Sequence, residues 1–526
     1  MKAKTLFHNG RILTQAGELR ADSIAICRNS IVAVGNRLEH DPDFRSYSQI
    51  NLRGRTVIPG LVDAHTHFHL FTKTYSQVSL NGLDSLDKCL RKIKRFTANL
   101  PRNRWVVGGG LFPDGFHSRT IPDRYMLDRV TGGRPAFIFF KDTHSAWINS
   151  KALEFGRITG ATPQPDGGRI ELLADGSPSG ILREMSAYLD LYHRIPPLPK
   201  RELNRCYDLA VNHAYRLGIT GVHSFDGPDG FEYFADLAER NKLGLRINYY
   251  PRADLLSQLE KTGTRYGTGT KFFRIAGVKL FADGALGSQS ALCFSKYLGS
   301  KDNRGIEVLS VAQMKQLARR AARLGLPCAI HAIGDKAVAN VLEAFESIKR
   351  PRLRHRIEHL QLVRRKDLAR VKRLGVVASM QPSHCPSDIG MARNYWGRRS
   401  TNAYVFRTVL DKGIPLAFGS DAPIEPLDPI AGIAAAVRRA RPNSRDVFHP
   451  EQRIFATEAL HAFTVGSAIA CGQEHQHGYL LPGYRADFVV LDRDLTRIAP
   501  SRIYDTRVLA TILDGKLKYC HSSLRW

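Results

Sequence analysis

The chain has 526 residues, of which 43% are hydrophobic and 24% are charged, a balance that is typical of a globular protein and excludes a disordered chain. Its formal net charge of +28 at pH 7 would suit a partner such as nucleic acid or an anionic lipid surface. The basic residues are nevertheless spread along the whole chain and accompany no nucleic-acid motif, so we predict a solvated basic surface and no specific nucleic-acid partner.

The cysteines and the apolar runs indicate the compartment. Eight cysteines are scattered without a C-x-x-C pair, which is typical of reduced thiols rather than of a disulfide framework. The first residues, MKAKTLFHNG, lack the apolar stretch of a signal peptide. No apolar run approaches the roughly 18 residues of a membrane helix. We therefore expect a cytoplasmic protein that has no membrane partner.

The two ends of the chain resemble each other. Residues 1–56 contain short strand-like runs separated by turn residues, and residues 472–526 contain similar runs bounded by Gly, Pro and Asp. Because strand-rich segments flank a long middle of another character, we predict one small composite β-sandwich built from both ends.

The middle of the chain alternates between strand-like and helix-like segments. Eight short apolar runs are separated mostly by segments with helical spacing of apolar residues: GLVDAHTH, GITGVHSF, LGLRINYY, IAGVKLFADG, LPCAIHA, RHRIEHL, GVVASMQP and PLAFGSDAP. This alternation predicts a (β/α)₈ TIM-like barrel over residues 57–70 and 204–471. A doubly wound open sheet is the alternative, and it is weakened because no G-x-G-x-x-G follows the early strands.

The first and second strand-like runs are separated by roughly 150 residues, which is too long for one crossover connection. We therefore predict an inserted subdomain over residues 71–203.

Polar side chains stand at the ends of several predicted barrel strands. Barrel strands are apolar on both faces and barrel active sites lie at their carboxyl ends, so such residues need a chemical reason. The set comprises four imidazoles, one amine and one carboxylate: His65, His67, Lys279, His331, His359 and Asp421. His65 and His67 leave the same side of a strand because they are two residues apart. Imidazole and carboxylate together are the ligands of Zn²⁺ and similar ions.

Lys279 lies inside the run AGVKLFADG and has two interpretations. It is either an outward lysine paired with a helix carboxylate, or an inward amine beside the metal ligands. Divalent cations would repel an inward ammonium and favour the neutral amine. That amine can react with CO₂, and the resulting carbamate has two oxygens that are able to bridge two metals.

These motifs resemble the amidohydrolase superfamily, and within it the amidohydrolase 3 group of YtcJ-like and N-substituted formamide deformylase-like hydrolases. The resemblance covers essentially the whole chain and rests on PGLVDAHTH, DTHSAWINSKAL, GVKLFADGALGS, IHAIGD, RIEHLQ, MQPSH, FGSDAP and LLPGYRADFVVLD. It implies two divalent metal ions, expected to be zinc. His65 and His67 would bind the more buried ion with Asp421, an N6-carboxylated Lys279 would bridge the two ions, and His331 and His359 would bind the second ion.

The activity expected from this set is hydrolysis of a non-peptide carbon–nitrogen bond, of amide or formamide type, in a small molecule by metal-activated hydroxide. Asp421 would move the proton, and we expect a homodimer. One alternative is a mononuclear deaminase of a cyclic amidine or nucleobase. It is disfavoured because the Glu of its H-x-x-E motif is replaced by Gly334. The other alternative is a non-catalytic scaffold or binding protein, which would require the loss of ligands that this chain retains.

Further residues are candidates for contact with the substrate. His384 follows the seventh strand and could orient a carbonyl as a second catalytic residue. Asp142, His144 and Trp147 lie in the predicted insert, where a lid could close, and Asp283 opens a glycine-bearing loop over the barrel mouth. Each of these residues could equally have a structural role.

Overall fold

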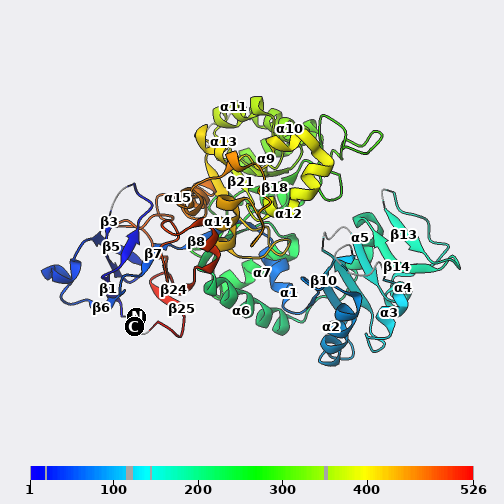
Figure 1. Ribbon diagram of the computed structural model, residues 1–526, viewed down its shortest axis with the longest axis horizontal. Coiled ribbons are helices and arrows are strands. Elements are labelled where there is room, and N and C mark those ends of the chain that lie inside the picture. Colours follow the sequence, from blue (N-terminus) through cyan, green and yellow to red (C-terminus); the bar gives the residue numbers. More distant parts are fainter. Residues whose placement is uncertain are drawn as a thin grey trace. The chain divides into compact units, whose positions relative to one another are not determined.

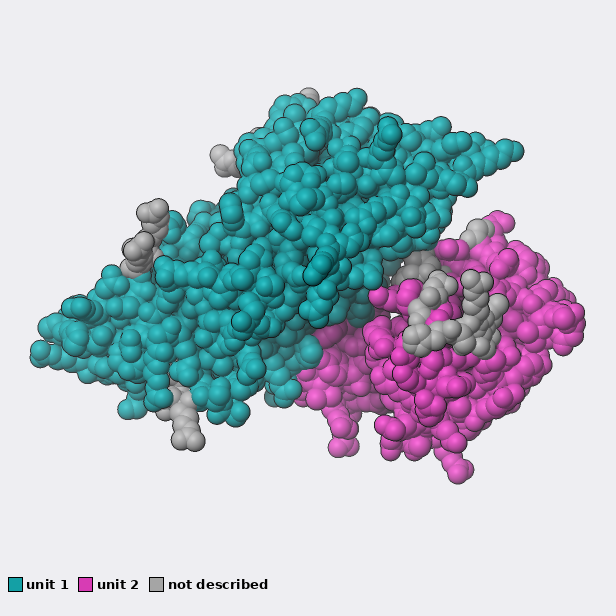
Figure 2. All heavy atoms as spheres, in the orientation of Figure 1, with its two compact units in different colours: residues 1–69, 211–526 teal, residues 70–210 magenta. Residues whose placement is uncertain are grey.

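The computed structural model describes residues 2–17, 20–113, 116, 122–141, 145–166, 168–348 and 353–524. The chain forms two compact units, Met1–His69 with Val211–Trp526 and Leu70–Ala210 (Figure 2). No helix among the described residues is long and apolar enough to cross a membrane.

Two parallel sheets form the centre of the larger unit. The first has the order β17-β16-β15-β8, with β8 (Leu61–Thr66), β15 (Ile219–Ser224), β16 (Arg246–Tyr249) and β17 (Phe273–Ile275). The second has the order β18-β19-β20-β21-β22, with β18 (Val278–Phe281), β19 (Cys328–Ala332), β20 (Arg356–His359), β21 (Val377–Met380) and β22 (Leu416–Phe418). Both sheets follow sequence order, so neither has the reversal of strand order that marks a doubly wound sheet.

The two parallel sheets approach each other at both edges without forming one continuous ladder among the described residues. At one edge, an isolated parallel bridge joins Arg252 to Lys279. At the other edge, the backbone N–H of Asp421 donates a hydrogen bond to the carbonyl of His65 at 2.7 Å. The strands are thus parallel as predicted, but the hydrogen-bonded closure expected of one eight-stranded barrel is not present in this part of the chain.

Helices alternate with these strands along the chain (Figure 1). They are α7 (Pro228–Glu239), α8 (Leu256–Lys261), α9 (Val311–Arg323), α10 (Asp335–Glu346), α11 (Arg365–Arg373), α12 (His384–Met391), α13 (Phe406–Asp411), α14 (Pro429–Arg438), α15 (Ala456–Ala462) and α16 (Val465–Ala470). Helix α9 shows why such segments are helical: Ser310 and Gln313 form a capping box, and Met314 and Ala318 are buried.

Strands from both ends of the chain pair in one sheet of order β25-β24-β23-β7-β2-β3 (Figure 1). Its members are β2 (Arg11–Leu13), β3 (Arg20–Ala21), β7 (Thr56–Pro59), β23 (Phe488–Leu491), β24 (Val508–Leu513) and β25 (Lys516–Cys520). A second sheet, β5-β4-β1-β6, packs with it around a shared apolar core that includes Phe7 and Phe488. These strands belong to the same compact unit as the parallel sheets. A separate composite domain over 1–56 and 472–526 therefore stays a prediction.

The smaller unit contains a sheet of its own. Its order is β13-β14-β12-β11-β10-β9, with β9 (Val78–Ser79), β10 (Val106–Leu111), β11 (Ala136–Phe140), β12 (Ser145–Ile148), β13 (Arg169–Leu172) and β14 (Pro178–Arg183). Helices α2 (Leu86–Ala98), α3 (Arg124–Asp128), α4 (Ser150–Gly156) and α5 (Met185–His193) accompany it. Trp147 is fully buried in one of the two apolar cores of this unit.

Candidate metal centre

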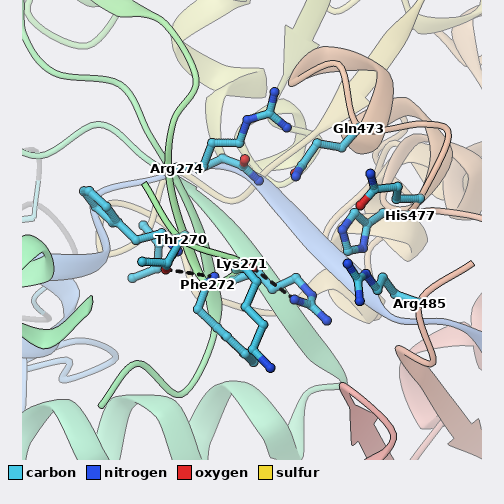
Figure 3. A pocket seen from close by; sticks show the side chains of 12 residues that line it. Thr270, Lys271, Phe272, Arg274, Gln473, His477 and Arg485 are labelled. Atoms are coloured by element: carbon cyan, nitrogen blue, oxygen red, sulfur yellow. Dashed lines mark hydrogen bonds between the residues drawn. The ribbon is translucent and has the colours of Figure 1, made fainter. Parts of the chain in front are cut away.

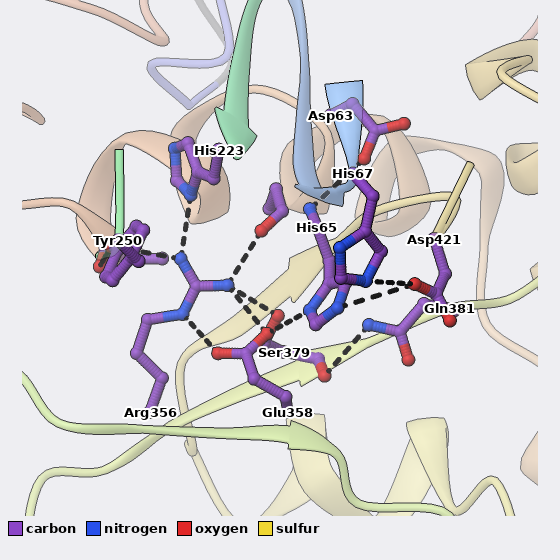
Figure 4. Close-up of polar contacts among 12 residues, drawn as sticks. Asp63, His65, His67, His223, Tyr250, Arg356, Glu358, Ser379, Gln381 and Asp421 are labelled. Carbon is purple, nitrogen blue, oxygen red and sulfur yellow. Dashed lines mark hydrogen bonds and ion pairs between the residues drawn. The ribbon is translucent and has the colours of Figure 1, made fainter. Parts of the chain in front are cut away.

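Three residues from the ends of β8 and β22 form a group of side chains, among the described residues, that could hold a metal ion. His65, His67 and Asp421 place one ligand atom each within 4.8 Å of one another. Oδ1 of Asp421 lies 3.5 Å from Nε2 of His65 and 3.4 Å from Nε2 of His67. Figure 4 shows the three side chains converging on one point. Asp421 has a φ of 64°, a conformation that costs free energy in a residue other than glycine and is typical of functional sites.

Two more histidines lie beside this group, at the ends of β19 and β20. The ring centroids of His331 and His359 are 4.4 Å apart, and those of His65 and His359 are 4.8 Å apart. His359, like Asp421, has a positive φ, of 72°. The sequence separates these residues widely, and the carboxyl ends of the parallel strands bring them to one edge.

His384, at the start of α12, also faces this group. Its Nε2 lies 3.5 Å from Oδ2 of Asp421, the carboxylate oxygen that faces away from His65 and His67. His384 is therefore placed where it could contact a molecule that approaches Asp421.

The Lys279 side chain points into the protein. It is only 1% exposed, and Nζ lies 4.6 Å from the centroid of the Phe225 ring. Nζ has no hydrogen-bond partner in the described part of the chain, which excludes the outward lysine paired with a helix carboxylate. Burial lowers the pKa of this amine to about 8, although the charges of Glu358 and Asp421 act in the opposite direction. The neutral amine is therefore accessible near neutral pH.

The donor atoms of the site fit a divalent metal ion. Four buried nitrogens at the site have no hydrogen-bond partner among the described residues: Nε2 of His65, Nδ1 of His359, Nε2 of His384 and Nζ of Lys279. Burial lowers the pKa of His65 to about 4 and that of His331 to about 3, and the charge of Lys279 adds to both shifts. Neutral imidazoles retain the lone pair that a metal requires, and unpaired buried nitrogens would otherwise be costly.

A buried ion pair lies behind His65, and neither of its residues is among those predicted from the sequence. Oε2 of Glu358 lies 2.5 Å from Nδ1 of His65. The guanidinium of Arg356 donates to both carboxylate oxygens of Glu358, at 2.7 and 2.9 Å, and both side chains are completely buried (Figure 4). A detectable signal existed, because Arg356 and Glu358 are two charged residues on one face of the run RHRIEHL, which is predicted to be a buried barrel strand.

Asp63 fixes the backbone around His65. Its Oδ1 accepts hydrogen bonds from the backbone N–H groups of His65, at 3.1 Å, and Ser420, at 2.9 Å. Gly419 permits this close approach, because a Cβ there would lie 2.3 Å from the backbone nitrogen of His65. Burial raises the pKa of Asp63 to about 7 despite these hydrogen bonds. The contacts hold the end of β8 against the segment that carries Asp421.

Two residues that are predicted to contact the substrate, Asp283 and Trp147, make buried structural contacts. Asp283 is buried, and its carboxylate accepts hydrogen bonds from the backbone N–H groups of Leu292, Ile333 and Gly334. Trp147 is 0% exposed and its Nε1 donates to the carbonyl of Asp123, so it offers no surface to a substrate. Asp142 and His144, the other two residues that are predicted in the insert, lie outside the described residues.

Asp283 also contributes to the site indirectly. Its Oδ1 lies 3.6 Å from Nε2 of His331, and the same Nε2 is 3.1 Å from the carbonyl oxygen of Gly284. Because a carbonyl can only accept, Nε2 carries the hydrogen in that contact and Nδ1 keeps its lone pair. Asp283 is therefore a positioning residue for the loop next to His331.

Comparisons with known proteins point to one family. The profile of the family described as "Amidohydrolase family" matches residues 49–519. The chain is 30% identical to the putative amidohydrolase YtcJ of Bacillus subtilis (strain 168) over 536 aligned residues, which cover 98% of this chain and 99% of that protein. It is 28% identical to the N-substituted formamide deformylase of Arthrobacter pascens, with 89% of each chain covered.

A crystal structure of another protein has a similar fold. An uncharacterized metal-dependent hydrolase from Pyrococcus furiosus superimposes with a TM-score of 0.78 at 29% sequence identity, covering 93% of this chain and 99% of that chain. The similarity of fold therefore extends over nearly the whole length of both chains.

Proposed function

The chain belongs to the amidohydrolase family and is a hydrolase of TIM-barrel-like α/β fold, and we propose that it cleaves a non-peptide carbon–nitrogen bond of amide or formamide type in a small molecule. The observation that carries the proposal is the meeting of His65, His67 and Asp421 beside His331 and His359. The similarity to an N-substituted formamide deformylase supports the bond type.

The residues divide between two metal positions in this proposal. His65, His67 and Asp421 would hold one divalent ion, and His331 and His359 would hold the second. Lys279 would bridge them as an N6-carboxylated side chain, which its burial and unpaired Nζ support. Zinc suits these donors. A divalent ion in this site supplies Lewis acidity to a carbonyl oxygen and lowers the pKa of water toward about 7.

Asp421 is suited to the proton transfer. Burial alone would raise its pKa, but the hydrogen bond from His67 and the charges of His65 and His359 lower the pKa well below its ordinary value. The side chain is therefore a carboxylate at neutral pH and can accept the proton of an attacking water at Oδ2. The same oxygen would then deliver the proton to the leaving nitrogen.

His384 would orient the substrate. Its Nε2 is 3.5 Å from Oδ2 of Asp421 and has no hydrogen-bond partner among the residues described. A donor in that place can hold the carbonyl oxygen of the substrate next to the carboxylate that transfers the proton. A TIM-like (β/α)₈ barrel over residues 57–70 and 204–471 and an inserted subdomain over 71–203 complete the architecture that we propose.

A substrate screen tests the proposal. The zinc-loaded protein is incubated with N-formyl amines, N-acyl amines and ring amides, and release of amine or acid is measured. We expect turnover with at least one class, and loss of that turnover in Asp421→Asn. Hydrolysis that persists in Asp421→Asn, or deamination without amide cleavage, would contradict the proposal.

A further inference from the structure

A cleft lies near the starts of the parallel strands, whereas the metal centre lies at their carboxyl ends. Val62 on β8, Gly221 on β15 and Arg246 on β16 line it near the starts of their strands, together with Gly60 just before β8, whereas His65 lies near the carboxyl end of β8. An adjoining cleft, drawn in Figure 3, has about 380 Å³ of empty space, part of which is open to solvent. Five residues line both clefts: Arg246, Asn248, Gln473, His477 and Arg485.

The acidic residues at this cleft are already neutralised. Both carboxylate oxygens of Asp487 accept hydrogen bonds from the guanidinium of Arg246, at 2.7 and 3.1 Å. Asp514 accepts from Nζ of Lys271 at 2.9 Å and from Arg246 at 3.2 Å. These two carboxylates and two cations balance each other, and His477 lies 3.4 Å from Asp487.

Two further arginines at the cleft have no acidic partner. In the part of the chain that the structure describes, neither Arg274 nor Arg485 forms an ion pair within 4.0 Å. Arg274 lies 4.5 Å from the centroid of the Tyr266 ring, and its Nε is buried without a hydrogen-bond partner. The cleft therefore has two guanidinium groups in excess of its carboxylates. Figure 3 shows Arg274, Gln473, His477 and Arg485 around the same opening.

A buried histidine supplies an independent observation. His223 is 0% exposed and lines the cleft that contains Val62 and Gly221. Its Nδ1 lies 2.7 Å from Nη1 of Arg356, and a guanidinium can only donate, so Nδ1 is the acceptor. Nε2 therefore carries the hydrogen, and it has no partner among the described residues. A buried N–H donor without an acceptor is costly, and a bound acceptor would remove that cost.

We propose that these joined clefts bind a small oxyanion, of phosphate or carboxylate type, between the guanidinium groups of Arg274 and Arg485 and the Nε2–H of His223. Guanidinium groups match the paired oxygens of both anions and form charge-assisted hydrogen bonds with them. The site is distinct from the metal centre, because none of the proposed metal ligands lines either cleft. It does not depend on the proposed function.

Calorimetric titration with inorganic phosphate tests the site, using the full-length zinc-loaded protein at constant ionic strength. We expect saturable binding that weakens at least tenfold in Arg274→Gln and in Arg485→Gln. Arg319→Gln is the matched control, since it removes one positive charge from α9, outside both clefts, and should bind as the unchanged protein does. A parallel titration with acetate decides whether phosphate or carboxylate is preferred.

His223→Asn tests the third donor. The asparagine can keep an acceptor near Arg356 but lacks a donor at the position of Nε2, so we expect weaker phosphate binding with an unchanged thermal midpoint in phosphate-free buffer. If this variant does not fold, the two arginine variants still test whether the clefts bind an oxyanion. Absence of binding by either anion, or equal affinity in the arginine variants and Arg319→Gln, would overturn the proposal.

Discussion

Oε2 of Glu358 lies 2.5 Å from Nδ1 of His65, and Arg356 holds the same carboxylate from its other side. Burial alone would raise the pKa of Glu358, but Arg356 and His65 lower it, so this group is a carboxylate and accepts the hydrogen of Nδ1. The imidazole of His65 is thereby kept with its Nε2 lone pair directed toward Asp421. Such a partner fixes the tautomer and orientation of a metal-binding histidine.

Replacing Glu358 by Gln should therefore weaken zinc binding about 10- to 100-fold, the usual cost of removing a group behind a metal ligand. Competition titration with a zinc chelator measures this affinity. Glu343→Gln on α10 is a control, because this side chain is 54% exposed and pairs with Lys315. Equal zinc affinity in the two variants would show that Glu358 has no influence on the metal centre.

Asp421→Asn keeps the size of the side chain and one oxygen but removes the basic group. We expect turnover of the substrate found in the screen to fall by about 10²- to 10⁴-fold, as for other losses of a general base. Metal content should fall much less. Both quantities are measured on the same sample, and near-normal turnover with the metal retained would exclude proton transfer by Asp421.

Lys279→Ala should lose both metal and activity, because the proposed bridge is absent. A short carboxylic acid such as acetate should restore part of each, since its two oxygens can occupy the vacated space. Metal content is measured by elemental analysis, with and without acetate. Lys366→Ala, at an exposed position on α11, is the control. Unchanged metal content in Lys279→Ala would show that the amine does not serve the metal centre.

The purified protein should carry about two divalent ions per chain, as two-metal hydrolases do. Removal of the ions with a chelator should abolish amide hydrolysis, and addition of zinc should restore it. Elemental analysis gives the number of ions. A protein that contains no metal and is not activated by zinc or manganese would contradict the proposed site.

The charge of +28 should not produce specific binding to nucleic acid. Many of the arginines are paired with carboxylates, as Arg370 is with Glu346 and Asp367. We expect weak association with DNA or RNA that disappears at moderate salt, because such binding depends on the release of counterions. Sequence-selective binding that survives at physiological salt would show that this expectation is wrong.

Much of the candidate site follows from local patterns. Polar residues at the ends of apolar runs mark His65, His331, His359 and Asp421 in the sequence alone. The inference holds because the carboxyl ends of parallel strands share one edge, so that strand order alone brings these ends together. Sequence motifs also suffice to recognise the family that the comparisons show.

The role of a side chain cannot be predicted from local spacing where it depends on partners that are distant in the chain. Glu358 and His65 are 293 positions apart, and no local pattern pairs them. Asp283 stands at the start of a loop, a position that predicts contact with the substrate. In the folded chain, its carboxylate instead accepts hydrogen bonds from surrounding backbone N–H groups. Trp147 stands in a motif that suggests a lid, yet its sheet packs it into a core.

The sequence by itself thus determined the family, the alternation of strands and helices, and the kinds of side chain at the strand ends, because these depend on residue type and spacing. Only the tertiary structure decided which groups lie behind the site and how closely the two parallel sheets approach at Lys279 and Asp421. It also decided the positive φ angles of His359 and Asp421. Those features arise from burial and from contacts between distant segments, which spacing along the chain does not encode.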